Sequence, residues 1–284
     1  MNHALAVHPN LLQDRVLVGL VGAGGSGSQM LSGLARLDAA IRALGHPGLD
    51  VIVYDPDDVS EANLGRQLFA PADVGRNKAH VLVTRTNAWF GTDWTSTAAR
   101  FEQASEGDLG LLISCVDTAK ARVAIGHEAS AQRALLWLDL GNRADDGQVV
   151  LGIPPWNEAH RRYTFRLPTV LELFPELATD KTLDADDAPS CSLAQALERQ
   201  HLYVNQAVVT PALQILWQIF RFGRLTWHGA FVNLAAGRTT PLPIDRAVWR
   251  RMGHDTAYTE TGREHTFTPG DWARAYSARY PNDV

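Results

Sequence analysis

Cysteine is scarce in this chain, and its scarcity excludes one way of holding a fold together. Cys115 and Cys191 are the two cysteines among 284 residues, and no C-x-x-C pair occurs. Two cysteines cannot make the disulfide framework of a small secreted protein. A chain of this length, with an apolar content of 45%, is instead long enough to bury a core of ordinary size.

Long hydrophobic runs and basic tracts are also missing. No stretch of eighteen apolar residues occurs, because polar side chains interrupt even the most hydrophobic segment, 204–222. Residues 1–14 lack the basic flank and apolar core of a secretory signal. The net charge is −5 and lysine and arginine form no tract, which argues against binding to nucleic acid. We therefore expect a cytoplasmic protein without a membrane segment.

An apolar strand followed by a glycine turn is the strongest signal near the start of the chain. Residues 16–21 predict a buried strand, and Gly22, Gly24 and Gly27 then form G-x-G-x-x-G. These glycines allow a tight turn, close approach of a phosphate and close packing of the next helix. That helix, predicted from Ser26 to about Leu44, would direct free N–H groups at the phosphate. We interpret the turn as a nucleotide site, although a turn that binds nothing remains the alternative.

The second predicted strand, 51–54, ends in Asp55. In dinucleotide enzymes an acid about twenty residues beyond the glycines holds the ribose hydroxyls. Asp55 lies 28 residues beyond Gly27, an offset that the long helix explains. NAD and ATP fit this much of the pattern equally well.

The following loop favours ATP over NAD, because it adds groups that an NAD site does not need. Two amides and two cations follow the predicted ribose acid within a short stretch: Asn63, Arg66, Gln67 and Lys78. A planar guanidinium and an ammonium suit adjacent phosphates of a triphosphate. The alternative is a solvated loop with ordinary surface charges.

These segments closely resemble the adenylating enzymes of the ThiF, MoeB and ubiquitin-activating superfamily. The matching segments are D-P-D-D-V at 55–59, N-L-G-R-Q at 63–67 and V-G-R-N-K at 74–78. The resemblance implies that Asp55 binds ribose and that Asp57 belongs to the same polar shell. It implies that the ATP phosphates are lined by Asn63, Arg66, Gln67 and Lys78. It also implies an acid over Mg²⁺ at the end of a later strand.

Asp117 is the candidate for that acid, because it follows a predicted strand at 109–116. Mg²⁺ favours one or two carboxylates together with substrate phosphates, so a single aspartate is sufficient. The alternative is that Asp117 is the N-cap of the next helix, predicted from Thr118 to Arg133. Both functions are compatible.

Alternation of strands and helices through residue 133 predicts a doubly wound, mostly parallel, Rossmann-like α/β sheet. Strands at 135–140 and 148–153 suggest a hairpin, and the resemblance implies a C-terminal antiparallel extension and a crossover loop. We expect an ATP-binding adenylation core at 1–155, the crossover loop at 156–200, and a helix and strands at 201–284 completing the same domain. Smaller elements are also predicted: strands at 94–101, 226–234 and 238–243, a helical stretch at 193–222 kinked or split at Pro211, and a short helix near 270–280.

Cys191 is the candidate nucleophile, because the ubiquitin-activating branch carries a cysteine in a P-x-C-T-L-like segment of its crossover loop. Here the segment reads P-S-C-S-L at 189–193. A thiolate near a helix N-terminus has a lowered pKa, whereas the acids Asp184, Asp186 and Asp187 would raise it if they pack nearby. An inert thiol remains the alternative. Cys115 is expected to lie in the core.

The arrangement is most similar to bacterial ThiF-type proteins of the PRTRC systems. Many superfamily members hold a structural zinc with two C-x-x-C pairs, and we expect none here. Relatives such as MoeB carry an N-terminal arginine that reaches the ATP of the partner subunit, whereas no arginine precedes Arg15. A homodimer is nevertheless the family expectation.

The resemblance implies ATP- and Mg²⁺-dependent adenylation of the C-terminal carboxylate of a ubiquitin-like, β-grasp protein. In the ubiquitin-activating branch the acyl group is then transferred to a cysteine as a thioester, and Cys191 is the candidate for that step. Three alternatives remain open: a non-catalytic adaptor for a nucleotide or a ubiquitin-like protein, an NAD-dependent oxidoreductase, and activation of another carboxylate, such as that of a tRNA-linked, peptide or sulfur-carrier substrate.

Overall fold

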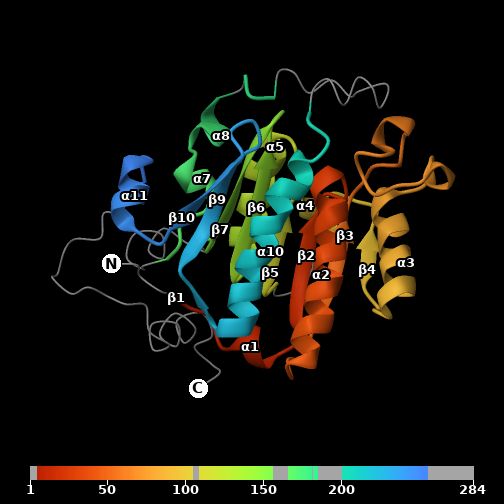
Figure 1. Ribbon diagram of the computed structural model, residues 1–284, viewed down its shortest axis with the longest axis horizontal. Coiled ribbons are helices and arrows are strands. Elements are labelled where there is room, and N and C mark those ends of the chain that lie inside the picture. The colour runs from red at the N-terminus through yellow and green to blue at the C-terminus, as the bar shows by residue number, and fades with distance from the viewer. Residues whose placement is uncertain (1–4, 105–108, 156–165, 181, 185–199, 255–284) are drawn as a thin grey trace.

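The computed structural model describes residues 5–104, 109–155, 166–180, 182–184 and 200–254. Its centre is an eight-stranded sheet in the order β10-β9-β7-β6-β5-β2-β3-β4, seen in Figure 1. The strands of this sheet are β2 (Val16–Val21), β3 (Leu49–Tyr54), β4 (Thr95–Thr97), β5 (Leu111–Ser114), β6 (Leu136–Asn142), β7 (Asp146–Gly152), β9 (Trp227–Asn233) and β10 (Arg238–Pro243). A separate pair joins β1 (Leu5–Ala6) to β8 (Arg224–Leu225).

Helices cover both faces of the sheet. One layer consists of α2 (Gly25–Ala43), with α3 (Lys78–Phe90) on one side and α10 (Val204–Phe222) on the other (Figure 1). The opposite layer is built around α5, which contacts the short helices, and comprises α4 (Phe101–Ala104), α5 (Ala119–Ala131), α7 (Val170–Leu173) and α8 (Glu176–Thr179). Short helices α1 (Asn10–Gln13) and α11 (Arg246–Arg251) lie near the chain ends that the structure describes. Within the described ranges no helix combines the length and apolar character needed to span a membrane.

The sheet confirms the predicted doubly wound, mostly parallel α/β class. Strands β4, β3, β2, β5 and β6 are parallel, and β7, β9 and β10 add an antiparallel extension. The inner parallel strands β2, β3, β5 and β6 are largely buried, so they consist mostly of apolar, often β-branched residues such as Val18 and Leu20, which are fully buried. The edge strand β4 is polar and partly exposed. The division into segments 1–155, 156–200 and 201–284 stays a prediction, although α10, β9 and β10 pack on the same sheet as the N-terminal strands.

Three predicted elements differ from those in the structure. The strand expected at 94–101 is reduced to β4, because Phe101 already begins α4. The strand expected at 109–116 ends at Ser114. Of the helical stretch expected at 193–222, the described residues 200–203 are not helical, and Pro211 does not split the rest, since α10 is continuous on both sides of it. Packing of α10 against α2 and the sheet outweighs the lost backbone hydrogen bond. The short helix expected near 270–280 lies outside the described residues.

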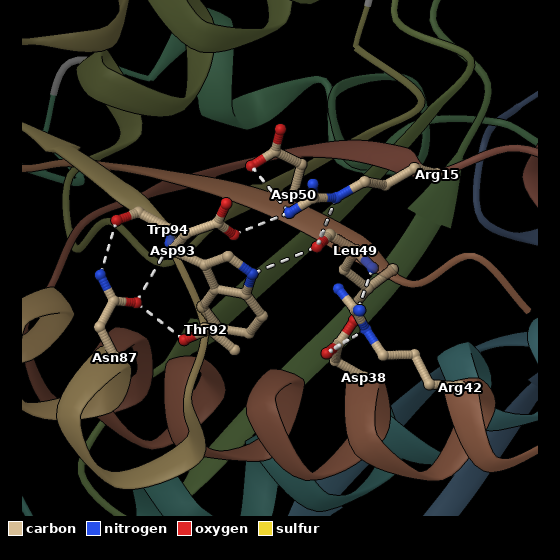
Figure 2. Close-up of polar contacts among 9 residues, drawn as sticks. All are labelled: Arg15, Asp38, Arg42, Leu49, Asp50, Asn87, Thr92, Asp93 and Trp94. Atoms are coloured by element: carbon tan, nitrogen blue, oxygen red, sulfur yellow. Dashed lines mark hydrogen bonds and ion pairs between the residues drawn. The ribbon is translucent and has the colours of Figure 1, made fainter.

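Polar contacts fix the amino end of the sheet, as Figure 2 shows. The Leu49 carbonyl accepts hydrogen bonds from Trp94 Nε1 at 3.2 Å and Arg15 Nε at 3.4 Å, and its N–H donates to Asp38 at 2.6 Å. Arg15 also pairs with Asp93 at 2.9 Å. The start of β3 is therefore fixed from three sides. Arg15 lies at the amino edge of the sheet, away from the carboxyl ends of its strands.

A buried histidine links the antiparallel extension to α11. His228 of β9 is fully buried, its Nδ1 lies 2.8 Å from the Leu151 carbonyl, and its Nε2 lies 2.8 Å from Trp249 Nε1. Because the indole N–H can only donate, Nε2 must accept, which requires the neutral ring with its hydrogen on Nδ1. Burial lowers the pKa of His228 to about 4.

This histidine predicts a pH-dependent stability. The His228 imidazole is protonated near pH 6.5 in the unfolded chain but only near pH 4 in the folded chain. The free energy of unfolding therefore falls as the pH drops from 6.5 to 4. His228→Gln keeps a donor and an acceptor but removes the titration. Urea unfolding should show that the wild type loses roughly 3 kcal/mol more of its free energy of unfolding than the variant does between pH 7 and pH 4. The exposed His127→Gln is the control, and parallel wild-type and His228→Gln curves would contradict the prediction.

Candidate functional site

A cavity of about 410 Å³ opens at the carboxyl ends of the parallel strands, within the size range of small-molecule sites. It lies where β2 and β5 are neighbours but their following helices go to opposite faces, the usual ligand position in an open α/β sheet. Its lining includes Gly22, Gly24, Asp55, Asp57, Arg66, Gln67, Lys78 and Asp117. Eight of the residues predicted from the sequence are therefore brought together.

The glycine turn needs its glycines for different reasons. Gly22 has a φ of +89°, and a Cβ there would lie 2.7 Å from the Cys115 carbonyl oxygen. A Cβ on Gly27 would overlap the carbonyl oxygen of Gly22, so this residue allows α2 to pack closely on the turn without lining the cavity. Gly24 precedes α2 and faces the cavity, with the Gln67 amide 3.9 Å from its ideal Cβ position. An anion could thus approach the backbone at Gly24.

Asp55 joins the glycine turn to the loop after β3. One carboxylate oxygen accepts from the Ala23 N–H at 2.6 Å, and the other accepts from the Asp57 N–H at 2.9 Å. Burial raises the pKa of Asp55, and the Ala23 N–H and the charge of Lys78 offset part of that rise. Each oxygen keeps a second lone pair, so the carboxylate can still accept from the hydroxyls of a sugar.

Lys78 is the first residue of α3, and it lines the cavity. Its Nζ lies 3.0 Å from Asp57 Oδ2, and its side chain is 11% exposed whereas that of Asp57 is 65% exposed. Asn77 caps α3 and donates to the carbonyls of Asp55 and Asp57, which fixes the helix start against the loop. Because Asp57 is largely solvated, an anionic ligand could replace it as the partner of Lys78.

Arg66 and Gln67 carry polar atoms that lack partners among the described residues. Arg66 Nη1 donates to Gln200 Oε1, but Arg66 Nε is buried without a hydrogen bond, as is Gln67 Oε1. Burial lowers the pKa of Arg66, and the negative charge of Asp117 opposes that change. Buried polar atoms without partners are costly, so their presence in a cavity indicates that a ligand supplies the missing bonds.

Asn63 is the predicted phosphate-lining residue that the structure does not bring to the cavity. Its Oδ1 accepts from the backbone N–H of Ser60 at 2.8 Å and from Ser60 Oγ at 3.1 Å. These bonds close the short turn at Glu61–Asn63. In this structure Asn63 shapes the loop that carries Arg66.

Asp117 is exposed at the cavity, directly before α5. The N-cap of α5 is Thr118, whose Oγ1 accepts from the Ala121 N–H at 3.2 Å, so the Asp117 carboxylate is not used as the cap. Asp184 accepts from Ala119 N at 2.7 Å and from Lys120 N at 3.0 Å. Asp184 therefore holds the helix start, and Asp117 is left facing the cavity.

The donor set fits Mg²⁺ bound partly by a substrate. Within the described ranges no group of three or more His, Cys, Asp or Glu side chains could hold a metal by itself. Mg²⁺ commonly uses one or two carboxylates together with substrate phosphates. Asp117 could hold it in this way when phosphates occupy the cavity.

Residues far apart in the sequence complete the cavity, and sequence reasoning missed them. Ser26 Oγ lies 3.1 Å from Asn205 Oδ1 and 3.4 Å from Asn142 Oδ1, and Gln200 adjoins Asn205. No local motif marks these amides, because the fold alone brings β6, α2 and α10 together. Cys115, expected in the core, packs against the core directly after β5 and is partly buried, and it also lines the cavity.

Neither cysteine is placed as a nucleophile by the described residues. Burial raises the pKa of the Cys115 thiol far above its ordinary value, which disfavours the thiolate. Cys191 lies outside the described residues, as do Asp186 and Asp187.

The glycine geometry predicts unequal effects of two substitutions in α2. Gly27→Ala places a methyl group on the backbone carbonyl of Gly22, which cannot move without opening the turn. Gly33→Ala meets the tip of the Leu213 side chain, which can rotate, and gains helix propensity. Urea unfolding should show a loss of about 3 kcal/mol for Gly27→Ala and a clearly smaller loss for Gly33→Ala. Equal losses would contradict the packing requirement at Gly27.

The chain is similar to known proteins in sequence and in fold. Over 153 residues, half of the chain, it is 30% identical to the ubiquitin-activating enzyme E1 1 of Schizosaccharomyces pombe, and the match covers 15% of that enzyme. The crystal structure of selenomethionine PaaA resembles it with a TM-score of 0.55 at 16% identity, over 81% of this chain and 64% of that one. The chain thus spans less than two thirds of the length of either relative.

A family-wide comparison covers most of the chain. The ThiF family matches residues 9–243, which include the glycine turn, the whole eight-stranded sheet and every described residue that lines the cavity. The chain belongs to the ThiF family.

Proposed function

We propose that this protein uses ATP and Mg²⁺ to adenylate the C-terminal carboxylate of a small ubiquitin-like protein. The observation that carries the proposal is the convergence of two cations and two acids on one cavity behind a glycine turn: Arg66, Lys78, Asp55 and Asp117. An NAD site would use the turn and Asp55 but has no third phosphate to occupy Arg66 and Lys78 together.

The chemistry follows from where these groups lie. The carboxylate oxygen of the partner protein attacks the α-phosphorus, the bond between the α-phosphorus and the bridging oxygen breaks, and pyrophosphate leaves with that electron pair. Arg66 and Lys78 offset the charge that builds on the phosphate oxygens, and Asp55 holds the ribose by accepting from its hydroxyls. Asp117 would hold Mg²⁺, and the ion when bound would supply further positive charge to the phosphates.

The later steps and the partners extend the same proposal. Cys191 would accept the acyl group from the adenylate as a thioester, releasing AMP. The partner would be a β-grasp protein, like the ubiquitin-like protein that accompanies the ThiF-type proteins of the PRTRC systems, which this chain resembles. The enzyme would act as a homodimer, as the family resemblance implies.

A second candidate is a non-catalytic adaptor that keeps the nucleotide fold. The Asn63 side chain, which bonds to Ser60 and does not line the cavity, favours it. ATP binding without any exchange of pyrophosphate would distinguish the adaptor from the enzyme.

Calorimetric titration with ATP-Mg²⁺ and with NAD tests the nucleotide site. We expect wild type to bind ATP and not NAD, and Lys78→Ala to raise the Kd for ATP at least about tenfold, because a charged contact to phosphate is lost. Lys120→Ala is the matched control, since Lys120 is exposed on α5 and is not among the cavity-lining residues. Tight NAD binding that is indifferent to Lys78 would contradict the assignment.

Exchange of labelled pyrophosphate into ATP, with the partner protein present, tests the acid and the cysteine separately. Asp117→Ala should lower the exchange rate by about a hundredfold or more, because the Mg²⁺ ligand is removed. Cys191→Ala should leave exchange unchanged and abolish a reducible thioester on gels. Asp93→Ala is the control acid at the opposite edge of the sheet. Full exchange by Asp117→Ala would rule out Asp117 as the metal ligand.

A further inference from the structure

Gln200 lies at the cavity, four residues before α10 begins, and its amide makes three contacts. Its Oε1 accepts from Arg66 Nη1 and lies 3.4 Å from Asn205 Nδ2. Its Nε2 donates to the carbonyl oxygen of Arg143 at 3.3 Å. One side chain therefore connects the loop after β3, the turn between β6 and β7, and the first turn of α10.

These partners determine which way the Gln200 amide faces. The Arg143 carbonyl can only accept, so it requires the Gln200 NH₂ group on its side. The guanidinium of Arg66 can only donate, so it requires the Gln200 oxygen on the other side. The amide cannot turn over without losing both bonds, and Arg66 Nη1 is therefore held at a fixed point.

Fixing Nη1 leaves a defined part of Arg66 for a ligand. A guanidinium carries five N–H donors in a rigid plane, and its Nε and Nη2 form an edge with two parallel donors. Arg66 Nε is buried and has no hydrogen-bond partner among the described residues. That edge matches two oxygens of one phosphate group.

We infer that Gln200 is a positioning residue, which holds Arg66 by Nη1 so that its Nε–Nη2 edge is presented to the phosphates of the nucleotide. The inference rests on the proposed ATP site and names a group outside the sequence motifs that predicted that site. Gln200 touches Arg66 and acts through it.

Gln200 is uncharged, and this property is as important for the function of Arg66 as the position of its amide. A carboxylate at this position would also accept from Nη1, but it would neutralise the guanidinium and compete with the phosphate for it. An amide orients the arginine and leaves its full charge to the ligand. Gln200→Glu should therefore weaken binding of phosphate although it preserves an acceptor, whereas Gln200→Ala should weaken it by releasing Arg66.

A double-mutant cycle tests the inference. The variants are Gln200→Ala, Arg66→Ala and the double variant, and each is titrated by calorimetry with ATP-Mg²⁺ and with adenosine. We expect Gln200→Ala to raise the Kd for ATP about tenfold and to leave the Kd for adenosine unchanged. With Arg66 already replaced, Gln200→Ala should change the Kd for ATP by less than about twofold. Gln206→Ala, an exposed glutamine on α10, is the matched control.

The outcomes separate this inference from the proposed function. Equal losses of ATP and adenosine binding in Gln200→Ala, or losses that simply add in the double variant, would overturn the positioning role. Wild-type ATP affinity in Gln200→Ala would overturn it too, with the nucleotide site intact. No ATP binding by wild type would overturn the proposed function and this inference with it. Thermal unfolding of each variant excludes a general loss of folding as the cause, and wild-type ATP affinity in Gln200→Glu would contradict the requirement for a neutral amide.

Discussion

The carboxylate of Asp55 is the contact on which the site depends. Its two oxygens accept from the N–H groups of Ala23 and Asp57, so it joins the glycine turn after β2 to the polar loop after β3. That loop leads to Arg66 and, through the Asn77 cap, to Lys78. A buried acid with both oxygens engaged cannot move independently of either segment. The positions of Lys78 and of the loop that carries Arg66 therefore depend on this residue.

Much of the fold and site could be predicted because the information is local. The strand at Val16–Val21 and the helix after it have clear composition, and the glycines have a direct steric function. Asp55 and Asp117 follow strands, and neighbouring parallel strands must bring their carboxyl ends to one edge. The segment of Lys78 matched a family pattern, and its place at the start of α3 brings it to the same edge.

The remaining features depend on contacts between distant segments. Gln200 and Asn205 reach the cavity because α10 packs on α2, which no short motif records. Asn63 fits the family pattern, but its side chain closes a local turn with Ser60. Cys115 was predicted to lie inside the strand at 109–116, but β5 ends one residue before it, so Cys115 packs against the core and also lines the cavity. In each case tertiary packing, rather than propensity, decides the environment of the side chain.

Asp184 and Gln200 together have a consequence for the cysteine between them. Asp184 is held by the first turn of α5, and Gln200, which lines the cavity, is held by Arg66. Cys191 is seven residues from the first and nine from the second, so an extended chain would carry its Cα no farther than about 25 Å from Asp184. The acyl transfer proposed for Cys191 would therefore be an intramolecular reaction, whose rate does not depend on enzyme concentration.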